Sequence, residues 1–186
     1  MSADSVRVAL PLFHAGRGGS TPTSALQLRF YRTDKQVFRD LNMLWHSRLP
    51  KICGSFGRAY YVAEFDGLFY ATAMWSNPVA RLLPQQTWLE LRRFAIADDA
   101  PKNTASRMLG WMVRDIRRRL PQIETLLSYQ DCDVHEGTIY KAVGWYQGNV
   151  DKRARTWTWR ANRTNQAVAP RIRWQKDISG GKTDAQ

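Results

Sequence analysis

Cysteines, acidic residues and long apolar runs are all scarce in this sequence. Its 186 residues include two cysteines, Cys53 and Cys132, and nothing in their surroundings requires a disulfide, so we expect reduced thiols. No apolar run approaches the roughly 20 residues that a membrane-spanning helix needs. The first residues also lack the basic start and apolar core of a secretory signal. These absences predict a cytoplasmic protein that does not contact a membrane.

A glycine-rich phosphate-binding loop is missing as well. The segment "GRGGSTP" (residues 16–22) has clustered glycines but lacks the Gly-Lys-Ser/Thr ending that places a lysine and a hydroxyl on phosphate and metal. We therefore interpret residues 1–24 as a flexible lead-in and not as a nucleotide site.

The shortage of acidic residues leaves a strongly basic chain. Twenty-eight lysines and arginines face 16 aspartates and glutamates, which gives a net charge of +12. Such a balance favours a polyanionic partner, and the excess of arginine over lysine favours phosphate groups. A basic surface that only keeps the protein soluble is the alternative. The composition, 44% hydrophobic and 24% charged, is that of a globular protein, and the length is that of one domain.

The spacing of apolar residues predicts one mixed sheet flanked by helices. The expected strands are residues 25–31, a hairpin over 59–75 that turns at Asp66-Gly67, 88–96, 125–129 and 155–159. The expected helices are one capped by Thr33 that ends near His46, one over 103–120 and one over 137–143. The central hairpin excludes a doubly wound nucleotide-binding fold.

This element order is that of the GNAT superfamily of acyl-CoA-dependent N-acyltransferases. We therefore expect an α/β (α+β) chain with a GNAT-like fold, in which a mixed central sheet is flanked by helices. Residues 25–160 are predicted to form a single catalytic domain, and residues 161–186 a basic C-terminal extension.

Two segments carry a more specific pattern, "LRRFAIADDAPKNTASRMLGWMVR" (residues 91–114) and "LLSYQDCDVHEGTIYKAVGW" (residues 126–145). Their order of motifs closely resembles the Mom family of Mu-like phages, whose members modify adenine in phage DNA. The resemblance implies an acyl-CoA-type donor such as acetyl-CoA, double-stranded DNA as the partner and the host bacterial cytoplasm as the location. It also implies conversion of adenine to its N6-carbamoylmethyl derivative, which protects DNA from restriction enzymes.

The resemblance implies catalytic roles for Arg93, Asp131, Tyr140 and His46. The fork of Arg93 would hold a carboxylate or phosphate, with a structural ion pair as the alternative. Asp131 would orient, or take a proton from, the exocyclic amine of adenine, and a turn aspartate is the alternative. Tyr140 matches the position of a general acid in many GNAT enzymes, or is a core tyrosine. Strand alternation places the neighbouring Arg92 on the opposite face.

The turn "DDAPKNTAS" (residues 98–106) stands where GNAT enzymes hold the coenzyme A pyrophosphate, but it contains no glycine. The resemblance implies that Ser106 contacts the donor, with a helix residue that has no chemical role as the alternative. Backbone N–H groups around Asn103 and Thr104 can face an anion at a helix start. Lys102 adds a positive charge, whereas the two aspartates repel one. Either the donor sits differently, or it is not ordinary coenzyme A.

No metal site is predicted. Asp131, Cys132, Asp133 and His135 fit no zinc spacing, and a strand followed by a turn does not let all four side chains converge. An iron ion shared with His46 stays open as an alternative.

The stretch from Lys152 to Lys176 contains eight basic residues, no acidic one and three tryptophans, which suits a surface that follows phosphates and stacks bases. A solvated basic tail is the alternative, and the arginines of the 103–120 helix with Trp111 are a second basic feature. The predicted DNA-binding residues are Arg153, Arg155, Arg160, Arg163, Arg171 and Arg173.

An adenine must leave the duplex before its amine can react, and aromatic side chains then hold it. The aromatic candidates are Tyr60, Tyr61, Trp75 and Trp145, although most buried aromatics belong to the core. Two rival functions remain: an ordinary N-acetyltransferase that uses acetyl-CoA on a small amine or protein, and a non-enzymatic DNA-binding protein that kept the fold.

Overall fold

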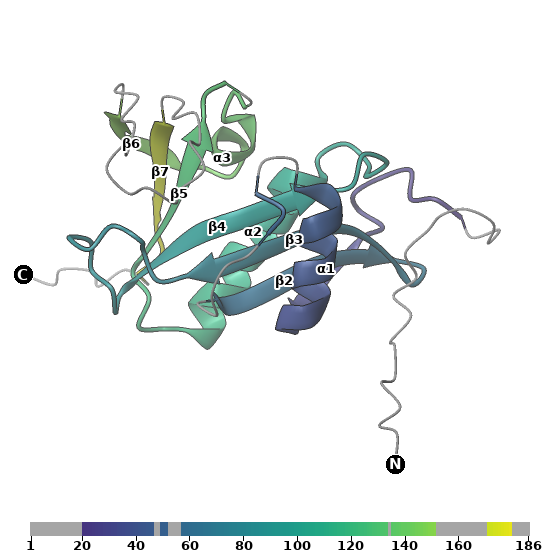
Figure 1. The fold of residues 1–186 in the computed structure, drawn as a ribbon, viewed down its shortest axis with the longest axis horizontal. Coiled ribbons are helices and arrows are strands. Elements are labelled where there is room, and N and C mark those ends of the chain that lie inside the picture. The colour runs from purple at the N-terminus through teal and green to yellow at the C-terminus, as the bar shows by residue number, and fades with distance from the viewer. Residues whose placement is uncertain (1–19, 47–48, 52–56, 134, 152–170, 180–186) are drawn as a thin grey trace, which may run out of the picture.

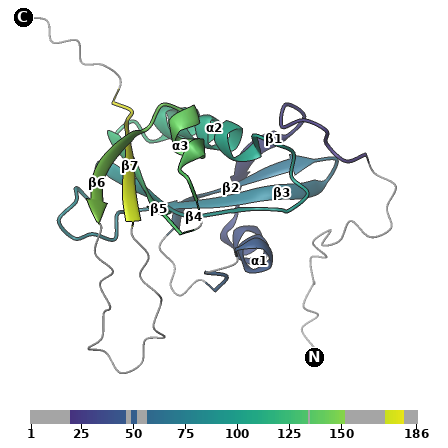
Figure 2. The same cartoon turned by 90° about the horizontal axis from the view of Figure 1, so that it is seen from above.

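The described part of the chain forms one mixed sheet with helices on both of its faces (Figure 1). The computed structural model describes residues 20–46, 49–51, 57–133, 135–151 and 171–179. In these, α1 covers one face of the sheet, here called the α1 face, and α2 and α3 cover the other, the α2 face (Figure 2). The elements are β1 (Arg29–Thr33), α1 (Lys35–Trp45), β2 (Gly57–Phe65), β3 (Leu68–Ser76), β4 (Trp88–Ile96), α2 (Thr104–Arg119), β5 (Thr125–Asp131), α3 (Thr138–Ala142), β6 (Tyr146–Asp151) and β7 (Arg171–Asp177).

The first four strands form an antiparallel meander in the order β1-β2-β3-β4. The turn between β2 and β3 places Asp66 at φ 51° and Gly67 at φ 78°. Both values lie in the left-handed region that a type I′ turn requires, so the predicted Asp-Gly hairpin is confirmed. Strand β1 begins at Arg29, later than predicted, because the residues before it form a turn in which the Gln27 N–H donates to the Ser24 carbonyl at 3.1 Å.

Helix α1 is capped by Asp34 and not by Thr33, as the sequence had suggested. The Asp34 carboxylate accepts two backbone N–H groups of the first turn, at 2.7 and 2.9 Å. The helix ends at Trp45, and the N–H of His46 donates to the Asn42 carbonyl at 2.9 Å. This end of α1 therefore fixes the backbone of His46.

Strands β4 and β5 are parallel and pair over only a short length. Their register runs from Trp88 opposite Thr125 to Leu91 opposite Ser128. Beyond this point the two strands diverge, β4 staying with β3 and β5 staying with β7 (Figure 1). The divergence separates the carboxyl ends of two neighbouring strands, which is where ligands bind in many sheets with parallel strands.

Strand β7 lies between β5 and β6 and pairs antiparallel with both. Residues 171–177 therefore belong to the sheet, and the predicted domain boundary at residue 160 is wrong for this segment. Its run of basic residues had suggested a tail, although "RIRWQKD" alternates as a strand does. The strand predicted at 155–159 lies outside the described residues.

Helix α2 binds the sheet through an apolar face and one buried carboxylate. Asp115 lies on that face and is 3% exposed. Its carboxylate accepts from Arg32 Nε of β1 at 2.9 Å and from Tyr61 Oη of β2 at 3.0 Å. Arg118 at 2.9 Å and Arg119 at 2.8 Å complete the cluster. Burial alone would raise the pKa of Asp115, but the hydrogen bonds from Arg119, Tyr61, Arg118 and Arg32 hold it below its ordinary value.

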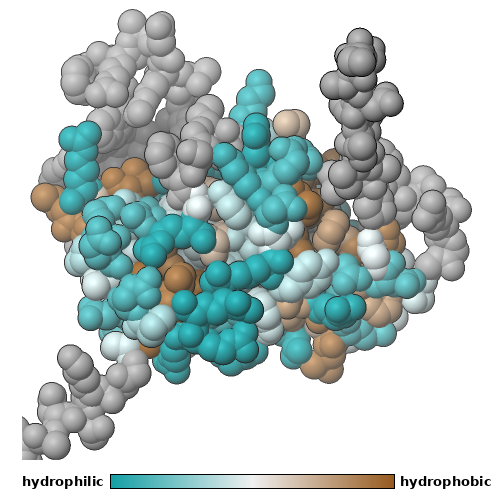
Figure 3. All heavy atoms as spheres, turned by 90° about the horizontal axis from the view of Figure 1, so that it is seen from below, coloured by the Kyte–Doolittle hydropathy of each residue, from teal (hydrophilic) through white to brown (hydrophobic). Residues whose placement is uncertain are grey.

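The arginines of this cluster extend from a buried carboxylate to the surface. The side chains of Arg118 and Arg119 are 70% and 54% exposed. The side of the molecule that faces down in Figure 1 is largely hydrophilic, and its hydrophobic residues form only small groups (Figure 3). None of the helices in the described ranges is long and apolar enough to cross a membrane.

Candidate functional site

The α1 face gathers charged groups around the end of α1 and the middle of β4. Arg93 lies on β4 past its last pair with β5, and its charge acts on the imidazole of His46 at the end of α1. His135, in the loop after β5, acts on the same imidazole. The positive charges of Arg93 and of a second histidine, His135, therefore both reach His46, the other predicted catalytic residue on this face.

A β-bulge places both arginines of the Arg92-Arg93 pair near one carboxylate. The register of β4 against β3 shifts at this point and leaves Arg92 as the extra residue. Arg92 Nε lies 3.5 Å from Glu90 Oε1, and the charge of Arg93 acts on Glu90 as well. The expectation that Arg92 faces the opposite side is wrong, because a bulge interrupts the alternation of a strand.

Glu90 itself was missed by the sequence reasoning. It is 6% exposed, and its Oε2 accepts the backbone N–H of Val79 at 2.8 Å. Burial raises the pKa of Glu90, although that hydrogen bond and the charges of Arg92, Arg93 and Arg171 oppose the rise. A lone carboxylate in the apolar run "WLELRRFAI" was the available signal.

His46 is held as a neutral imidazole. Burial lowers its pKa, and the charges of Arg93 and His135 lower it further. Its Nδ1 accepts the backbone N–H of Leu49 at 3.3 Å. In a neutral ring with Nδ1 as acceptor, Nε2 carries the proton. His46 can therefore donate a hydrogen bond through Nε2 at neutral pH.

Asp131 ends β5 and lies opposite Arg171 of β7. Alternation along β5 places it on the same face as Tyr129, whose phenol is affected by the charge of Glu90. Asp131 Oδ1 also accepts the N–H of Asp133 at 3.1 Å, so the turn role is present. Its catalytic role stays a prediction.

Tyr140 lies on the other side of the sheet. It is 7% exposed on α3, and its ring stacks on Trp174 with centroids 5.3 Å apart. Tyr140 Oη and Ser128 Oγ are 2.8 Å apart, and Ser128 is the last residue of β5 that pairs with β4. Burial raises the pKa of Tyr140, and the Ser128 hydrogen bond opposes the rise. The phenol thus lies next to the point where the strands separate.

The start of α2 has some of the features of an anion-binding site. Asn103 is at φ 68° and makes no side-chain cap, so side-chain capping does not occupy the first N–H groups of the helix. Lys102 and Asn103 are exposed. Thr104 is buried, and its hydroxyl donates to the Pro101 carbonyl at 2.6 Å. Ser106 Oγ donates to the Asn103 carbonyl at 3.2 Å. Of the four predicted residues, Thr104 is the one whose hydroxyl faces inward.

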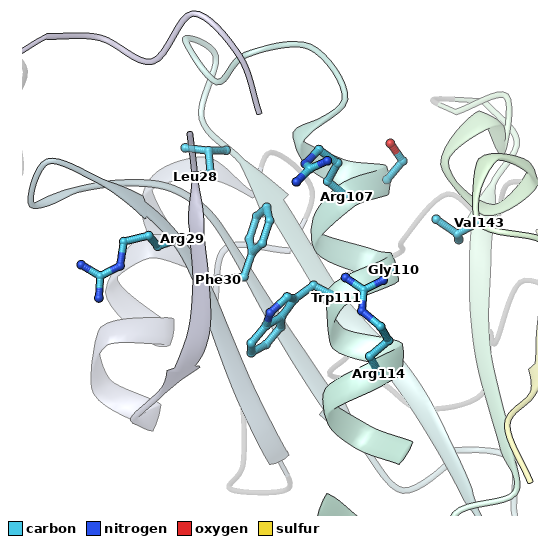
Figure 4. Close-up of a pocket in the computed structure, with 9 residues that line it drawn as sticks. Leu28, Arg29, Phe30, Arg107, Gly110, Trp111, Arg114 and Val143 are labelled. Atoms are coloured by element: carbon cyan, nitrogen blue, oxygen red, sulfur yellow. The ribbon is translucent and has the colours of Figure 1, made fainter. Parts of the chain in front are cut away.

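A pocket of about 550 Å³ extends from Ser106 along the outer face of α2. Phe30 of β1 and Trp111 approach each other at its base, with ring centroids 6.3 Å apart (Figure 4). Its lining includes three arginines and no acidic residue. The lining residues are Leu28, Arg29, Phe30, Ser106, Arg107, Gly110, Trp111, Arg114 and Val143.

Gly110 lies in the middle of α2 although the fold does not require a glycine there. A Cβ at this position would lie 3.6 Å from Val143 Cγ1 and 3.9 Å from a terminal guanidinium nitrogen of Arg114, which are ordinary contacts. A glycine inside a helix costs about 1 kcal/mol relative to alanine. Gly110 therefore leaves this part of the pocket floor without a side chain.

The aromatic residues suggested for a base pocket are mostly core residues. Tyr61, Trp75 and Trp145 are 0%, 0% and 5% exposed. Tyr60 is partly buried and lies 5.2 Å from Phe38, centroid to centroid. The suggestion that aromatic side chains line an open base pocket is wrong for Tyr61, Trp75 and Trp145, because all three belong to the hydrophobic core.

The predicted DNA-binding residues are described only in part. Arg171 is exposed and Arg173 is partly exposed, and both lie on β7, opposite Asp131 and Tyr129. The others, Arg153, Arg155, Arg160 and Arg163, lie outside the described residues.

No metal centre is assembled in the described ranges. There, no three side chains among histidine, cysteine, aspartate and glutamate come close enough to hold an ion. Cys132 is a free thiol, and Cys53 lies outside the described residues. Iron therefore has no support from these residues.

The strand order, the divergence of β4 and β5 and the helix after β4 define a GNAT-type N-acyltransferase fold. Similar solved structures are the ribosomal-protein-S18-alanine N-acetyltransferase from Escherichia coli (TM-score 0.58, 13% identity, 86% of this chain and 99% of that chain) and the IAA acetyltransferase from Bacillus cereus (0.58, 13%, 81% and 99%). A third is the spermidine N-acetyltransferase from Vibrio cholerae in complex with CoA and spermine (0.57, 11%, 83% and 97%). These identities are low, so the likeness shows the fold.

The particular family follows from the sequence. Residues 56–182 match the Mom protein family, and the chain belongs to this family. Among curated proteins, none matches the sequence well enough to count as a relative.

Proposed function

We propose that this protein is a transferase that modifies the exocyclic amine of adenine in DNA, converting adenine to its N6-carbamoylmethyl derivative and so protecting the DNA from restriction. The observation that carries the proposal is the arrangement at the β4–β5 divergence, in a chain that belongs to the Mom family. Arg93 and His46 lie on the α1 face, Tyr140 on the α2 face, and the strands separate between them.

In this proposal the donor binds on the α2 face. The uncapped start of α2 and the arginine-lined pocket fit the phosphates of an acyl-CoA-type donor, and Gly110 leaves room for it. Arg107 and Arg114 would hold the phosphates, and Ser106 would contact the donor. When bound, such a donor supplies the carbon that is transferred. Solved relatives in fold carry CoA or acetyl-CoA, which agrees with this placement.

The base enters from the α1 face. The carboxylate of Asp131 would orient the amine and take the proton that N6 loses as its new bond to carbon forms. His46, neutral at pH 7, would donate from Nε2 to an acceptor atom of the base. Arg93 would bind a phosphate or carboxylate in the two-pronged geometry of its guanidinium. Tyr140 Oη would give a proton to the departing group.

The chemical structure of the proposed product limits which compounds can be the donor. Attack of N6 on a thioester carbonyl gives an amide, whereas in a carbamoylmethyl group N6 is bonded to a methylene carbon. Plain acetyl transfer therefore does not give this product, and the donor or a later step differs from it.

The test is nucleoside mass spectrometry of plasmid DNA from bacteria that express the wild type, Asp131→Asn or Asp133→Asn. Asp131→Asn keeps an oxygen for the turn hydrogen bond, and Asp133→Asn is the matched control. We expect a heavier deoxyadenosine with the wild type and the control only, and its mass identifies the added group. Unmodified DNA in every case, with the soluble protein present, contradicts the proposal.

The second candidate is an N-acetyltransferase that acts on a small amine, and the fold similarity to a spermidine N-acetyltransferase favours it. It predicts release of coenzyme A from acetyl-CoA with a polyamine and without DNA. The same assay with DNA in place of the polyamine separates the two functions.

A further inference from the structure

Tyr129 is an exposed aromatic residue at the β4–β5 divergence. It is the first residue of β5 past the last pair with β4, and it is 36% exposed, whereas the residues of β5 before it are buried. Neither the family resemblance nor the sequence reasoning gives it a role. Its ring is therefore partly buried and partly open to solvent at the point where β4 and β5 part.

Charges around Tyr129 suit a nucleic acid strand. Arg173 of β7 lies opposite it and its positive charge acts on the phenol, and Arg171 lies opposite Asp131, two residues further along. Burial raises the pKa of Tyr129, and the charge of Glu90 raises it further, so the phenol stays neutral. A neutral ring with Arg173 opposite it and Arg171 two residues further along offers a stacking surface beside phosphate-binding groups.

We propose that Tyr129 is the platform on which the extruded adenine stacks, with Arg171 and Arg173 binding the phosphates beside it. The inference rests on the proposed function and adds to it the position of the base. Two residues of a strand span about 6.8 Å, so a purine stacked on Tyr129 brings its amine toward Asp131 on the same face. This platform replaces the aromatic residues that the structure buries in the core.

The experiment measures stacking separately from phosphate binding. The probes are a single-stranded oligonucleotide with one 2-aminopurine, whose fluorescence falls when it stacks on an aromatic ring, and the same strand with an abasic site. The proteins are the full-length wild type, Tyr129→Phe, Tyr129→Ala and Tyr146→Ala. Tyr146 is an exposed tyrosine of β6 and serves as the control for loss of an aromatic side chain.

We expect quenching with the wild type, Tyr129→Phe and Tyr146→Ala. Tyr129→Ala loses the quenching and binds the 2-aminopurine strand about 5- to 150-fold more weakly, while its affinity for the abasic strand is unchanged. Modified deoxyadenosine in plasmid DNA falls with Tyr129→Ala and is retained with Tyr129→Phe.

Two results overturn the inference. Equal quenching by Tyr129→Ala and the wild type shows that the base lies elsewhere, and an equal loss of affinity for both strands shows that Tyr129 supports phosphate binding and not base stacking. Failure of the proposed function looks different, because then the wild type itself leaves plasmid DNA unmodified.

Discussion

Replacing Gly110 by alanine should stabilise the protein and lower its affinity for the donor. The new Cβ meets Val143 and Arg114 at 3.6 and 3.9 Å, so nothing needs to move. Removing a glycine from a helix interior then gains about 1 kcal/mol, which raises the melting temperature of a chain of this size by about 2–4 °C.

The same methyl group stands on the floor of the pocket between Arg107 and Arg114. If the donor lies there, it must shift, and an extra methyl group in a close-packed contact costs about 1–3 kcal/mol. Binding of coenzyme A or acetyl-CoA, measured by isothermal titration calorimetry, should weaken by about 5- to 150-fold. Weaker binding without loss of stability is the expected combination.

Each half of this reasoning can fail separately. A lower melting temperature for Gly110→Ala refutes the argument that the helix has room for a Cβ. A higher melting temperature with unchanged donor affinity refutes the assignment of the pocket to the donor. Ser106→Ala, at the other end of the pocket, improves helix propensity without adding an atom, so weaker donor binding in this variant would come from the lost hydroxyl and not from crowding.

Three further predictions concern the charged and polar groups. Asp115→Ala should lower the free energy of unfolding in urea by about 3–5 kcal/mol. Because the folded pKa of Asp115 lies below its unfolded value, its stabilisation is present above pH ~4 and the difference from the wild type shrinks as the pH falls further. A difference that stays constant with pH contradicts the role of the charged cluster. In an NMR titration His46 should show a pKa below its ordinary value that rises toward that value in Arg93→Gln, and no change there would mean that burial and His135 lower it without Arg93. Tyr140→Phe should cost about 0.5–1.5 kcal/mol of stability but lower DNA modification by about 10²–10⁴-fold. The control is Ser128→Ala, which loses the same hydrogen bond and keeps the phenol. Equal activities of the two variants would make Tyr140 a core residue.

The meander, the Asp-Gly hairpin and the two longer helices could be predicted because each depends on local signals. Period-two alternation, a turn that demands positive φ and an apolar stripe are all visible within a few residues. Strand β7 could not be placed in this way, since its partners β5 and β6 lie far away in sequence and its arginines resemble those of a tail. Which strand pairs with which is a property of the whole sheet.

The candidate site shows the same division. The family resemblance selected Arg93 and His46, and in the structure the charge of Arg93 lowers the pKa of His46. The alternation of side chains along a strand predicted the wrong face for Arg92, because a β-bulge depends on the pairing with the neighbouring strand. Alternation also gave no reason to consider Glu90 or Tyr129. The exposure of a tyrosine depends on where two strands part, which no local pattern reveals.

The late position of β7 affects how the chain is made in the cell. Strands β1 to β4 are neighbours in sequence and can pair while the ribosome is still translating the rest. Strand β5 has only four residue pairs with β4 until residues 171–177 emerge, so a nascent chain presents an apolar strand edge to other nascent chains. Slower synthesis at low temperature should therefore improve the soluble yield, and trimming into β7 should send the protein into inclusion bodies even though Asp131 and Tyr140 are untouched.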